Sequence, residues 1–157
     1  GMLLNNEMGD FAALPGKPNQ FGLVQGERNR IEGGKRPLSS MSPTIVFRDG
    51  KPWLATGSPG GSRIITTVLQ TLLNAMAFDM NVAAAGMNSR IHHQWLPDEI
   101  LAESGISPDT VNLLQQKGHK VVLGGQTIGR TQSIMLEDGW LLGATDTRRP
   151  EGWVAGY

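Results

Sequence analysis

Cysteine is absent from the 157-residue sequence, and this absence excludes several classes of site. Without a thiol the chain forms no disulfide framework, no thiolate-bound zinc or iron–sulfur centre and no cysteine nucleophile. An excess of one charge sign is also missing, because 14 Lys and Arg residues balance 14 Asp and Glu residues. A net charge of zero gives no overall field that attracts nucleic acid or an anionic membrane, so we expect neither as a partner.

A long hydrophobic run is missing as well. No apolar stretch approaches the roughly 20 residues that a membrane-spanning helix needs. The first residues do not combine a basic segment with an apolar one, as a secretory signal does. The sequence therefore predicts no membrane contact and does not itself indicate a compartment. Its length of 157 residues fits a single domain.

Glycine, by contrast, is abundant, with 21 residues. Residues 15–36 combine Gly, Pro, Asn, Gln and charged residues without an apolar period, which predicts a long irregular loop. The dipeptides Asp49-Gly50 and Asp138-Gly139 are typical of type I′ turns and predict two hairpins. These hairpins join residues 44–48 to 52–56 and residues 132–136 to 140–144.

Three helices are expected in the middle of the chain. The segment from Arg63 to Phe78 predicts a helix with one wide buried face, because its apolar residues recur at a period of 3.6. That face would contain Ile64, Ile65, Val68, Leu69, Leu72, Leu73 and Met76. An alanine-rich helix is expected from 81 to 87. A third begins after Ser107, with a proline at its first position, and ends near Gly118.

The remaining strands complete the expected fold. Residues 119–123 have the composition of a strand, and the opening Leu3-Leu4 resembles the end of one. This order of elements predicts an α+β fold in which a mostly antiparallel sheet is covered by helices.

The glycine-rich segment 57–62 lies between an expected strand and an expected helix. Unpaired N–H groups at a helix start stabilise negative charge, so the segment could form an anion or oxyanion site. No Lys-Ser or Lys-Thr follows the glycines and the dinucleotide-binding spacing is absent, which excludes those two phosphate-binding motifs. The alternative is a tight turn in which Ser62 caps the helix. The residues alone leave both interpretations open.

Two further groups of polar residues are candidates for ligand binding. The hydroxyls of Ser39 and Ser40 can donate hydrogen bonds to a carboxylate, and the alternative is a capping and turn role. Glu7 and Asp10 could together hold an ammonium group, because two carboxylates are too few ligands for a metal. The alternative for this pair is two solvated surface acids.

The adjacent His92 and His93 invite comparison with metal sites. Neighbouring side chains point apart in a strand and about 100° apart in a helix, so a shared ion would need an unusual loop. We therefore expect these histidines to pack structurally, and the sequence predicts no metal and no cofactor.

Five motifs occur in one order along the whole chain. They are LLNNEMGDF (residues 3–11), RPLSSMSPT (36–44), TGSPGGSRII (56–65), RIHHQWLP (90–97) and the closing GY (156–157). Their order and spacing resemble the small subunit of γ-glutamyltranspeptidase. The resemblance covers the chain from its first residue to its last.

The resemblance implies an N-terminal-nucleophile hydrolase fold, a four-layer αββα sandwich of which residues 1–157 would be a single partial domain. It implies an enzyme that moves the γ-glutamyl group of glutathione and related amides to water or an amino acceptor, without a cofactor. It also implies a large subunit, cut from the same precursor, as partner, and export to the periplasm or cell surface.

The same resemblance assigns roles to particular residues. Asp10, with Glu7 beside it, resembles the carboxylate that binds the α-ammonium of the γ-glutamyl donor. The pair Ser39-Ser40 resembles the hydroxyls that hold the donor's α-carboxylate. The pair Gly60-Gly61 resembles the backbone N–H donors of the oxyanion hole.

The chain also departs from the family pattern. In the family, the small subunit begins with a nucleophilic threonine upstream of the LLNN motif, whereas this sequence begins at Gly1. We therefore expect the isolated chain to lack the nucleophile and to be inactive. Asp146-Thr147-Arg148 stands where Asp-Pro-Arg is usual, and Gly9 where Asp is common.

Two alternative functions remain open from the sequence. One is a non-catalytic relic that acts as an oligomeric or binding protein. The other is a related amidohydrolase, such as a cephalosporin acylase or a poly-γ-glutamate hydrolase. In the family, the segment upstream of the LLNN motif also carries the first strands of the central sheet, and without them we expect a sheet edge to be exposed. We therefore predict a homo-oligomer with Met2, Leu3 and Leu4 at or near the interface.

Overall fold

The computed structural model describes residue 2, residues 4–148 and residues 152–156. The strands are β1 (Thr44–Arg48), β2 (Lys51–Gly57), β3 (Ile91–His92), β4 (Ile100–Ala102), β5 (Val121–Leu123), β6 (Gln132–Glu137) and β7 (Trp140–Thr145). The helices are α1 (Arg63–Met76), α2 (Val82–Met87) and α3 (Pro108–Gln116), with short 3-10 turns η1 (Glu7–Asp10) and η2 (Glu27–Asn29). No helix in these residues is long and apolar enough to cross a membrane.

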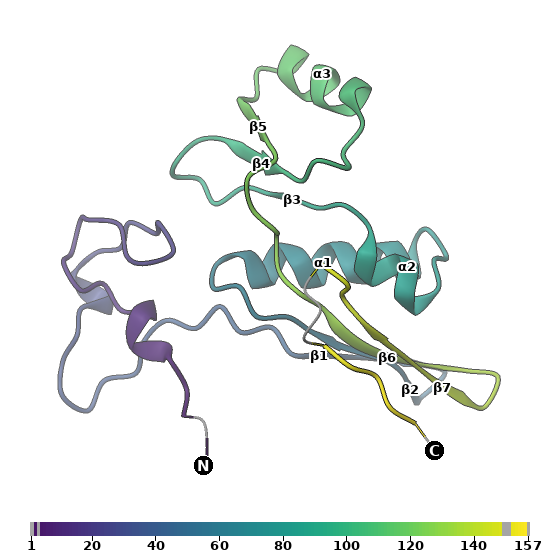
Figure 1. Cartoon of the computed structure of the whole chain (residues 1–157). Helices are drawn as coiled ribbons and strands as arrows, with labels where there is room; N and C mark the ends of the chain where they lie inside the picture. Colours follow the sequence, from purple (N-terminus) through teal and green to yellow (C-terminus); the bar gives the residue numbers. More distant parts are fainter. Residues whose placement is uncertain (1, 3, 149–151, 157) are drawn as a thin grey trace.

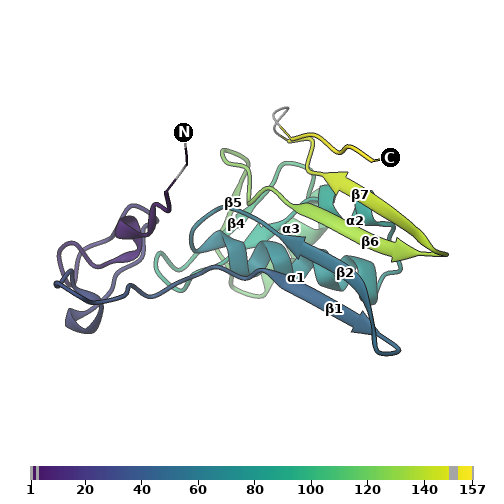
Figure 2. The same cartoon turned by 90° about the horizontal axis from the view of Figure 1, so that it is seen from below.

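These elements form two sheets (Figure 1). The larger sheet is antiparallel with strand order β1-β2-β6-β7, and α1 and α2 cover one of its faces (Figure 2). The smaller sheet has the order β3-β4-β5, with β3 and β4 antiparallel and β4 and β5 parallel. The parallel pair is joined through α3, as parallel neighbours require a crossover connection.

Both predicted hairpins are confirmed. Asp49 and Gly50 have φ values of 52° and 75°, and Asp138 and Gly139 have values of 50° and 83°. A type I′ turn needs positive φ at both central residues, which explains why these dipeptides connect β1 to β2 and β6 to β7. The two hairpins are joined by the pairing of β2 with β6.

The predicted ends and caps of the helices are largely confirmed. Asn81 caps α2 by accepting a hydrogen bond from the N–H of Ala84, and Ser107 caps α3 by accepting one from Thr110. Pro108 is at the first position of α3, where its missing N–H costs no hydrogen bond. Strand β5 also lies within the expected residues 119–123.

The prediction of one wide buried face on α1 is wrong. Ile64, Val68 and Ala75 face the core, but Leu69 and three similar residues are exposed: Ile65, Leu73 and Met76. The larger sheet covers only one side of the helix, so a strip on its other side stays open. Two threonines complete the buried face instead of leucines, and the Oγ1 of Thr71 donates to the carbonyl of Thr67 at 2.9 Å.

The core lies between the larger sheet and its helices. Its buried members are Leu54, Ala75, Val82, Ala85 and Met135. On the opposite face, no helix or second sheet of the described residues covers the strands, and only the segment 152–156 lies along part of it. This face forms an apolar groove of about 740 Å³ lined by residues that include Ile45, Ala55, Ile134, Gly143 and Trp153.

The N-terminal part differs from the expectation of a strand end. Met2 and residues 4–6 have no regular structure, and Leu3 lies outside the described residues. No described strand runs beside this segment, so the chain turns directly into η1. Residues 15–36 are irregular apart from η2, and isolated bridges join Ala12 to Arg30 and Pro18 to Val24.

Candidate functional site

The glycine turn connects the end of β2 to the start of α1. Gly60 and Gly61 have φ values of 140° and 57°, which side chains disfavour, so the turn depends on glycine at both positions. Their carbonyls accept hydrogen bonds from the N–H groups of Arg63 and Ile64 at 3.1 Å. Their own N–H groups have no hydrogen-bond partner within the described chain. The turn therefore offers two adjacent free donors at the start of a helix, as a bound anion requires.

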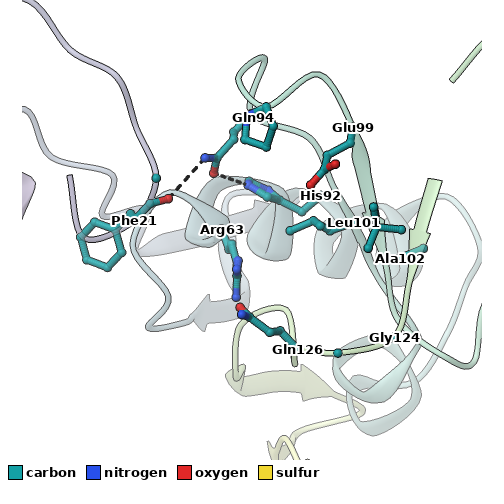
Figure 3. A pocket seen from close by; sticks show the side chains of 13 residues that line it. Phe21, Arg63, His92, Gln94, Glu99, Leu101, Ala102, Gly124 and Gln126 are labelled. Carbon is teal, nitrogen blue, oxygen red and sulfur yellow. Dashed lines mark hydrogen bonds between the residues drawn. The ribbon is translucent and has the colours of Figure 1, made fainter. Parts of the chain in front are cut away.

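An aromatic ring and one amide side chain hold this turn from outside. The ring of Phe21, from the long loop, lies directly against Gly61 and leaves no space for a Cβ there. The Ser62 hydroxyl donates to Oε1 of Gln94 at 2.8 Å. Nε2 of the same amide donates to the carbonyl of Phe21 at 3.3 Å. The Gln94 amide thus joins the long loop, the turn and the segment after β3, and Figure 3 shows its contact with the Phe21 carbonyl.

A buried histidine completes this contact. His92 lies in β3, and its Nε2 is 3.0 Å from Oε1 of Gln94 while its Nδ1 is 2.8 Å from Oγ1 of Thr66. Burial lowers the pKa of His92, and the positive charge of Arg63 lowers it further. The hydrogen bond to Gln94 acts in the opposite direction. This lowered pKa favours the neutral imidazole.

The two expected acids lie together on η1. Asp10 is half-buried and Glu7 is close enough to affect it. Burial raises the pKa of Asp10, and repulsion by the Glu7 carboxylate raises it further. An ammonium group bound here would relieve that repulsion, so the pair suits a cation.

The serine pair lies on the segment that leads into β1. Ser39 is exposed, and its Oγ accepts a hydrogen bond from the N–H of Met41 at 3.2 Å. Ser40 is half-buried, and its carbonyl accepts from the hydroxyl of Ser42 at 3.2 Å. Both hydroxyls keep hydrogen-bonding capacity for a ligand, because a hydroxyl has one donor and two acceptor positions.

Two asparagines connect the acids to the other parts of the site. Nδ2 of Asn29 donates to the carbonyl of Asp10 at 2.8 Å, and its Oδ1 accepts from the N–H of Leu38 at 2.9 Å. This bridge holds the acidic turn beside the approach to the serine pair. Asn19 donates to the carbonyl of Gly9 at 3.3 Å and accepts from the N–H of Phe21 at 3.0 Å. The long loop is thus linked both to η1 and to the glycine turn.

A cavity of about 380 Å³ opens between the long loop, the start of α1 and the smaller sheet (Figure 3). Phe21, Arg63, His92 and Gln94 contribute to its lining. The Arg63 and Gln126 side chains point toward one another across it. The lining also includes the acid Glu99, which is already paired with Lys120 at 2.9 Å.

A second group of charges is buried behind α2. Arg90 pairs with Asp146 at 2.9 Å, and Arg148 pairs with both Asp146 and Glu103, at 2.8 and 2.9 Å. Arg148 also donates to the carbonyls of Met87 and Asn88, at 2.9 and 2.6 Å, close to the end of α2. Burial opposes ionisation of Asp146, but the hydrogen bonds from the two arginines outweigh it and lower its pKa. This cluster fixes the segment after β7 to α2, β3 and β4.

The two adjacent histidines have separate partners. His92 is buried within the contacts described above, while His93 lies 3.1 Å from Asp98 through its Nε2. The described part of the chain contains no group of three or more His, Cys, Asp or Glu residues placed to hold a metal ion.

The motifs and this geometry have close counterparts among known proteins. The sequence profile of the family described as "Gamma-glutamyltranspeptidase" matches residues 1–156. The chain belongs to this family. The glutathione hydrolase proenzyme of Escherichia coli (strain K12) is 59% identical over 158 residues, which cover 100% of this chain and 27% of the proenzyme.

Solved structures of γ-glutamyltranspeptidases share the fold. The T380A mutant of the Helicobacter pylori protein matches with a TM-score of 0.87 and 47% identity, covering 95% of this chain and 82% of that one. The Pseudomonas nitroreducens protein complexed with L-DON matches with a TM-score of 0.85 and 41% identity, covering 99% and 83%. These matches confirm the predicted family and its N-terminal-nucleophile hydrolase fold. The chain spans 27% and 29% of the length of two proenzymes that it matches.

The structure adds residues that the motifs do not identify as functional. Asn19, Asn29 and Gln94 each join two segments through a side-chain amide. Gln94 belongs to the RIHHQWLP motif, where the histidines are the more conspicuous residues. Asparagine in a loop indicates turns in general, so the composition carries no signal for these particular bridges.

Proposed function

We propose that this chain supplies the donor-binding and oxyanion-stabilising parts of an enzyme that transfers or hydrolyses the γ-glutamyl group of glutathione and related amides. The observation that carries the proposal is that the N–H groups of Gly60 and Gly61 have no partner among the described residues. Family membership supports it, because proteins of this family include glutathione hydrolase proenzymes.

The chemistry proposed for the turn is stabilisation of a tetrahedral intermediate. A hydroxyl attacks the γ-carbonyl carbon and gives up its proton, and the carbonyl oxygen becomes an oxyanion. The N–H groups of Gly60 and Gly61 donate to that oxygen, and removal of one such donor typically slows catalysis by about 10²–10³-fold. Collapse of the intermediate expels the amine with a proton and leaves an ester, which water or a second amine then cleaves.

The nucleophile in this proposal is a threonine outside the 157 residues, freed at the N-terminus of the small subunit by cleavage of a precursor. Its own α-amino group accepts the hydroxyl proton. The large subunit of the same precursor is the proposed partner, and the periplasm or cell surface the proposed location. Without the nucleophile and the large subunit, the chain by itself would then not form the complete site that binds the transition state.

Recognition of the donor is proposed to use both ends of its amino acid group. The Asp10 carboxylate, with Glu7 beside it, pairs with the α-ammonium. The hydroxyls of Ser39 and Ser40 donate to the α-carboxylate. The Asn29 bridge between the two segments supports this assignment, because it holds the acidic turn and the serine approach together.

Release of the amine from a γ-glutamyl anilide tests the proposal. The complete processed protein that contains this chain should turn over the anilide, and the isolated 157-residue chain should show only background. Turnover by the isolated chain that disappears on replacement of one of its own Ser or Thr residues would place the nucleophile inside it. A complete protein that binds γ-glutamyl compounds without turnover would favour a non-catalytic role.

A further inference from the structure

We propose that Gln94 is a positioning residue for the oxyanion turn and sets the direction of the Gly60 and Gly61 N–H groups through Ser62. The inference rests on the proposed function of that turn. Gln94 itself does not contact the reacting atoms in this scheme. Its role follows from four hydrogen bonds made by one side-chain amide.

All four contacts agree on one orientation of the amide. Nε2 of Gln94 faces two carbonyl oxygens, those of Phe21 at 3.3 Å and Leu96 at 3.2 Å. Oε1 faces two groups able to donate, the hydroxyl of Ser62 at 2.8 Å and Nε2 of His92 at 3.0 Å. Exchanging the nitrogen and oxygen would place the amide oxygen against the two carbonyl oxygens of Phe21 and Leu96, so the orientation of the amide is fixed.

The amide also fixes the tautomer of the buried histidine. Because Oε1 of Gln94 can only accept, Nε2 of His92 carries the hydrogen and Nδ1 is left to accept from Thr66. The low pKa of His92 keeps this neutral form. Gln94 is therefore held by β3 and by α1 as well as by the long loop.

The turn needs such support because glycines are the softest positions of the backbone. The ring of Phe21 packs against Gly61, but an apolar ring makes no hydrogen bond that would fix the direction of the two peptide N–H groups. Ser62 follows immediately, and its hydroxyl is the nearest side chain that Gln94 can hold. Catalytic donors must stay within about 0.5 Å of their productive position. A loosened turn should therefore lower kcat more than it weakens substrate binding.

The backbone around Gln94 is itself constrained. Trp95 has a φ value of 73°, a left-handed conformation that is uncommon for a bulky residue, although its side chain is largely exposed. The Trp95 N–H donates to Nδ1 of His93 at 3.2 Å. Such conformations persist where the surroundings impose them, so the backbone next to Gln94 is held in place.

The kinetic test uses the complete processed enzyme and the variant Gln94→Met, which keeps the length of the side chain and removes its hydrogen bonds. We expect kcat to fall by roughly 10-fold to 100-fold with KM changed by less than about twofold. Gln94→Glu keeps an oxygen toward Ser62 and should retain more of kcat than Gln94→Met. Gln116→Ala, on the exposed side of α3, is the matched control and should behave as wild type.

Ser62→Ala tests the same connection from its other end and keeps the proposal testable if Gln94→Met does not fold. It should lower kcat similarly, and combining it with Gln94→Met should add little, because both remove one contact. Unchanged kcat in either variant, or an effect on KM alone, would overturn the inference.

A second measurement needs no catalysis. In the 157-residue chain, NMR should show altered amide shifts and faster hydrogen exchange at Gly60 and Gly61 in Gln94→Met, but not in Gln116→Ala. Unaltered glycine amides would reject the positioning role whether or not the enzyme is active. Absence of γ-glutamyl turnover in the wild-type enzyme would instead reject the proposed function.

Discussion

Arg90 and Asp146 lie 56 positions apart in the sequence and form an ion pair of 2.9 Å with side chains that are 1% and 0% exposed. Such a buried pair stabilises little in itself, because removing two charges from water is expensive. Breaking it from one side is costly, since the other charge stays buried without its partner.

We therefore expect Asp146→Asn to lower the free energy of unfolding by about 3–5 kcal/mol. Urea denaturation of the 157-residue chain measures this loss. Asp109→Asn is a suitable control, because Asp109 lies in the exposed first turn of α3, where such a change costs about 0.3–1 kcal/mol. Equal effects of the two substitutions would contradict a structural role for the buried cluster.

The same cluster predicts a dependence of stability on pH. The pKa of Asp146 in the folded chain lies below its ordinary value of 3.8. Its contribution is therefore complete above that ordinary value and disappears as the pH falls through the lowered pKa. The difference in Tm between wild type and Asp146→Asn should be largest near neutral pH and shrink in acid. A difference in Tm that grows in acid would contradict a lowered pKa of Asp146.

The parts of the fold that local sequence determines are the ones that could be predicted. Hairpins at Asp49-Gly50 and Asp138-Gly139 need only adjacent residues, and so do the caps at Asn81 and Ser107. The pairing of β2 with β6 depends on residues about 80 positions apart, for which the sequence has no local signal. The exposed strip on α1 has the same origin, because periodicity shows where an apolar face lies but not what covers it.

The candidate site divides in a similar way. Glu7, Asp10, Ser39, Ser40, Gly60 and Gly61 stand out because they belong to motifs, and their roles stay predictions. Gln94 does not stand out, since glutamine forms bridges only where the fold brings suitable partners to it. Its four partners come from the turn, the long loop, β3 and its own segment.

Asp10 provides a prediction about donor binding in the complete enzyme. Asp10→Ala should lower kcat/KM by a factor equivalent to about 2–4 kcal/mol, because a charge-assisted hydrogen bond to the donor is lost. Since burial and Glu7 raise the pKa of Asp10, donor binding should weaken on acidification earlier than an ordinary aspartate predicts. Glu7→Gln should move this acid limb to lower pH. An acid limb that Glu7→Gln leaves unchanged would show that Glu7 does not affect the titration of Asp10.

The glycine turn predicts a split between kcat and KM. Gly61→Ala places a Cβ against the Phe21 ring at a positive φ, so the turn must shift, and with it the two N–H groups proposed to form the oxyanion hole. We expect a fall in kcat that exceeds any change in KM. Gly57→Ala, whose Cβ would have open space at an ordinary φ, is the control and should stay active. A change in KM alone would indicate a steric role for the turn.

Self-association is the remaining prediction for the isolated chain. Met2 and Leu4 are 85% and 82% exposed, which leaves them available for the expected interface. Light scattering at micromolar concentration should show a dimer or larger species, and Leu4→Glu should shift it toward monomer. If Ile134→Glu on the open sheet face has that effect instead, the interface lies on the sheet. A monomer at all concentrations would reject association altogether.

The pairing of β2 with β6 also has a consequence for the order in which the chain folds. Leu54 pairs with Met135 only after the helices α1 to α3 and the smaller sheet have been closed into one long loop. Each hairpin forms from neighbouring residues within about 1–10 μs, but joining them requires contacts of high sequence separation, which slow folding. We therefore expect docking of the two hairpins to be slower than the formation of either one. A ribosome must also release residues through Thr145 before the four-stranded sheet can be completed.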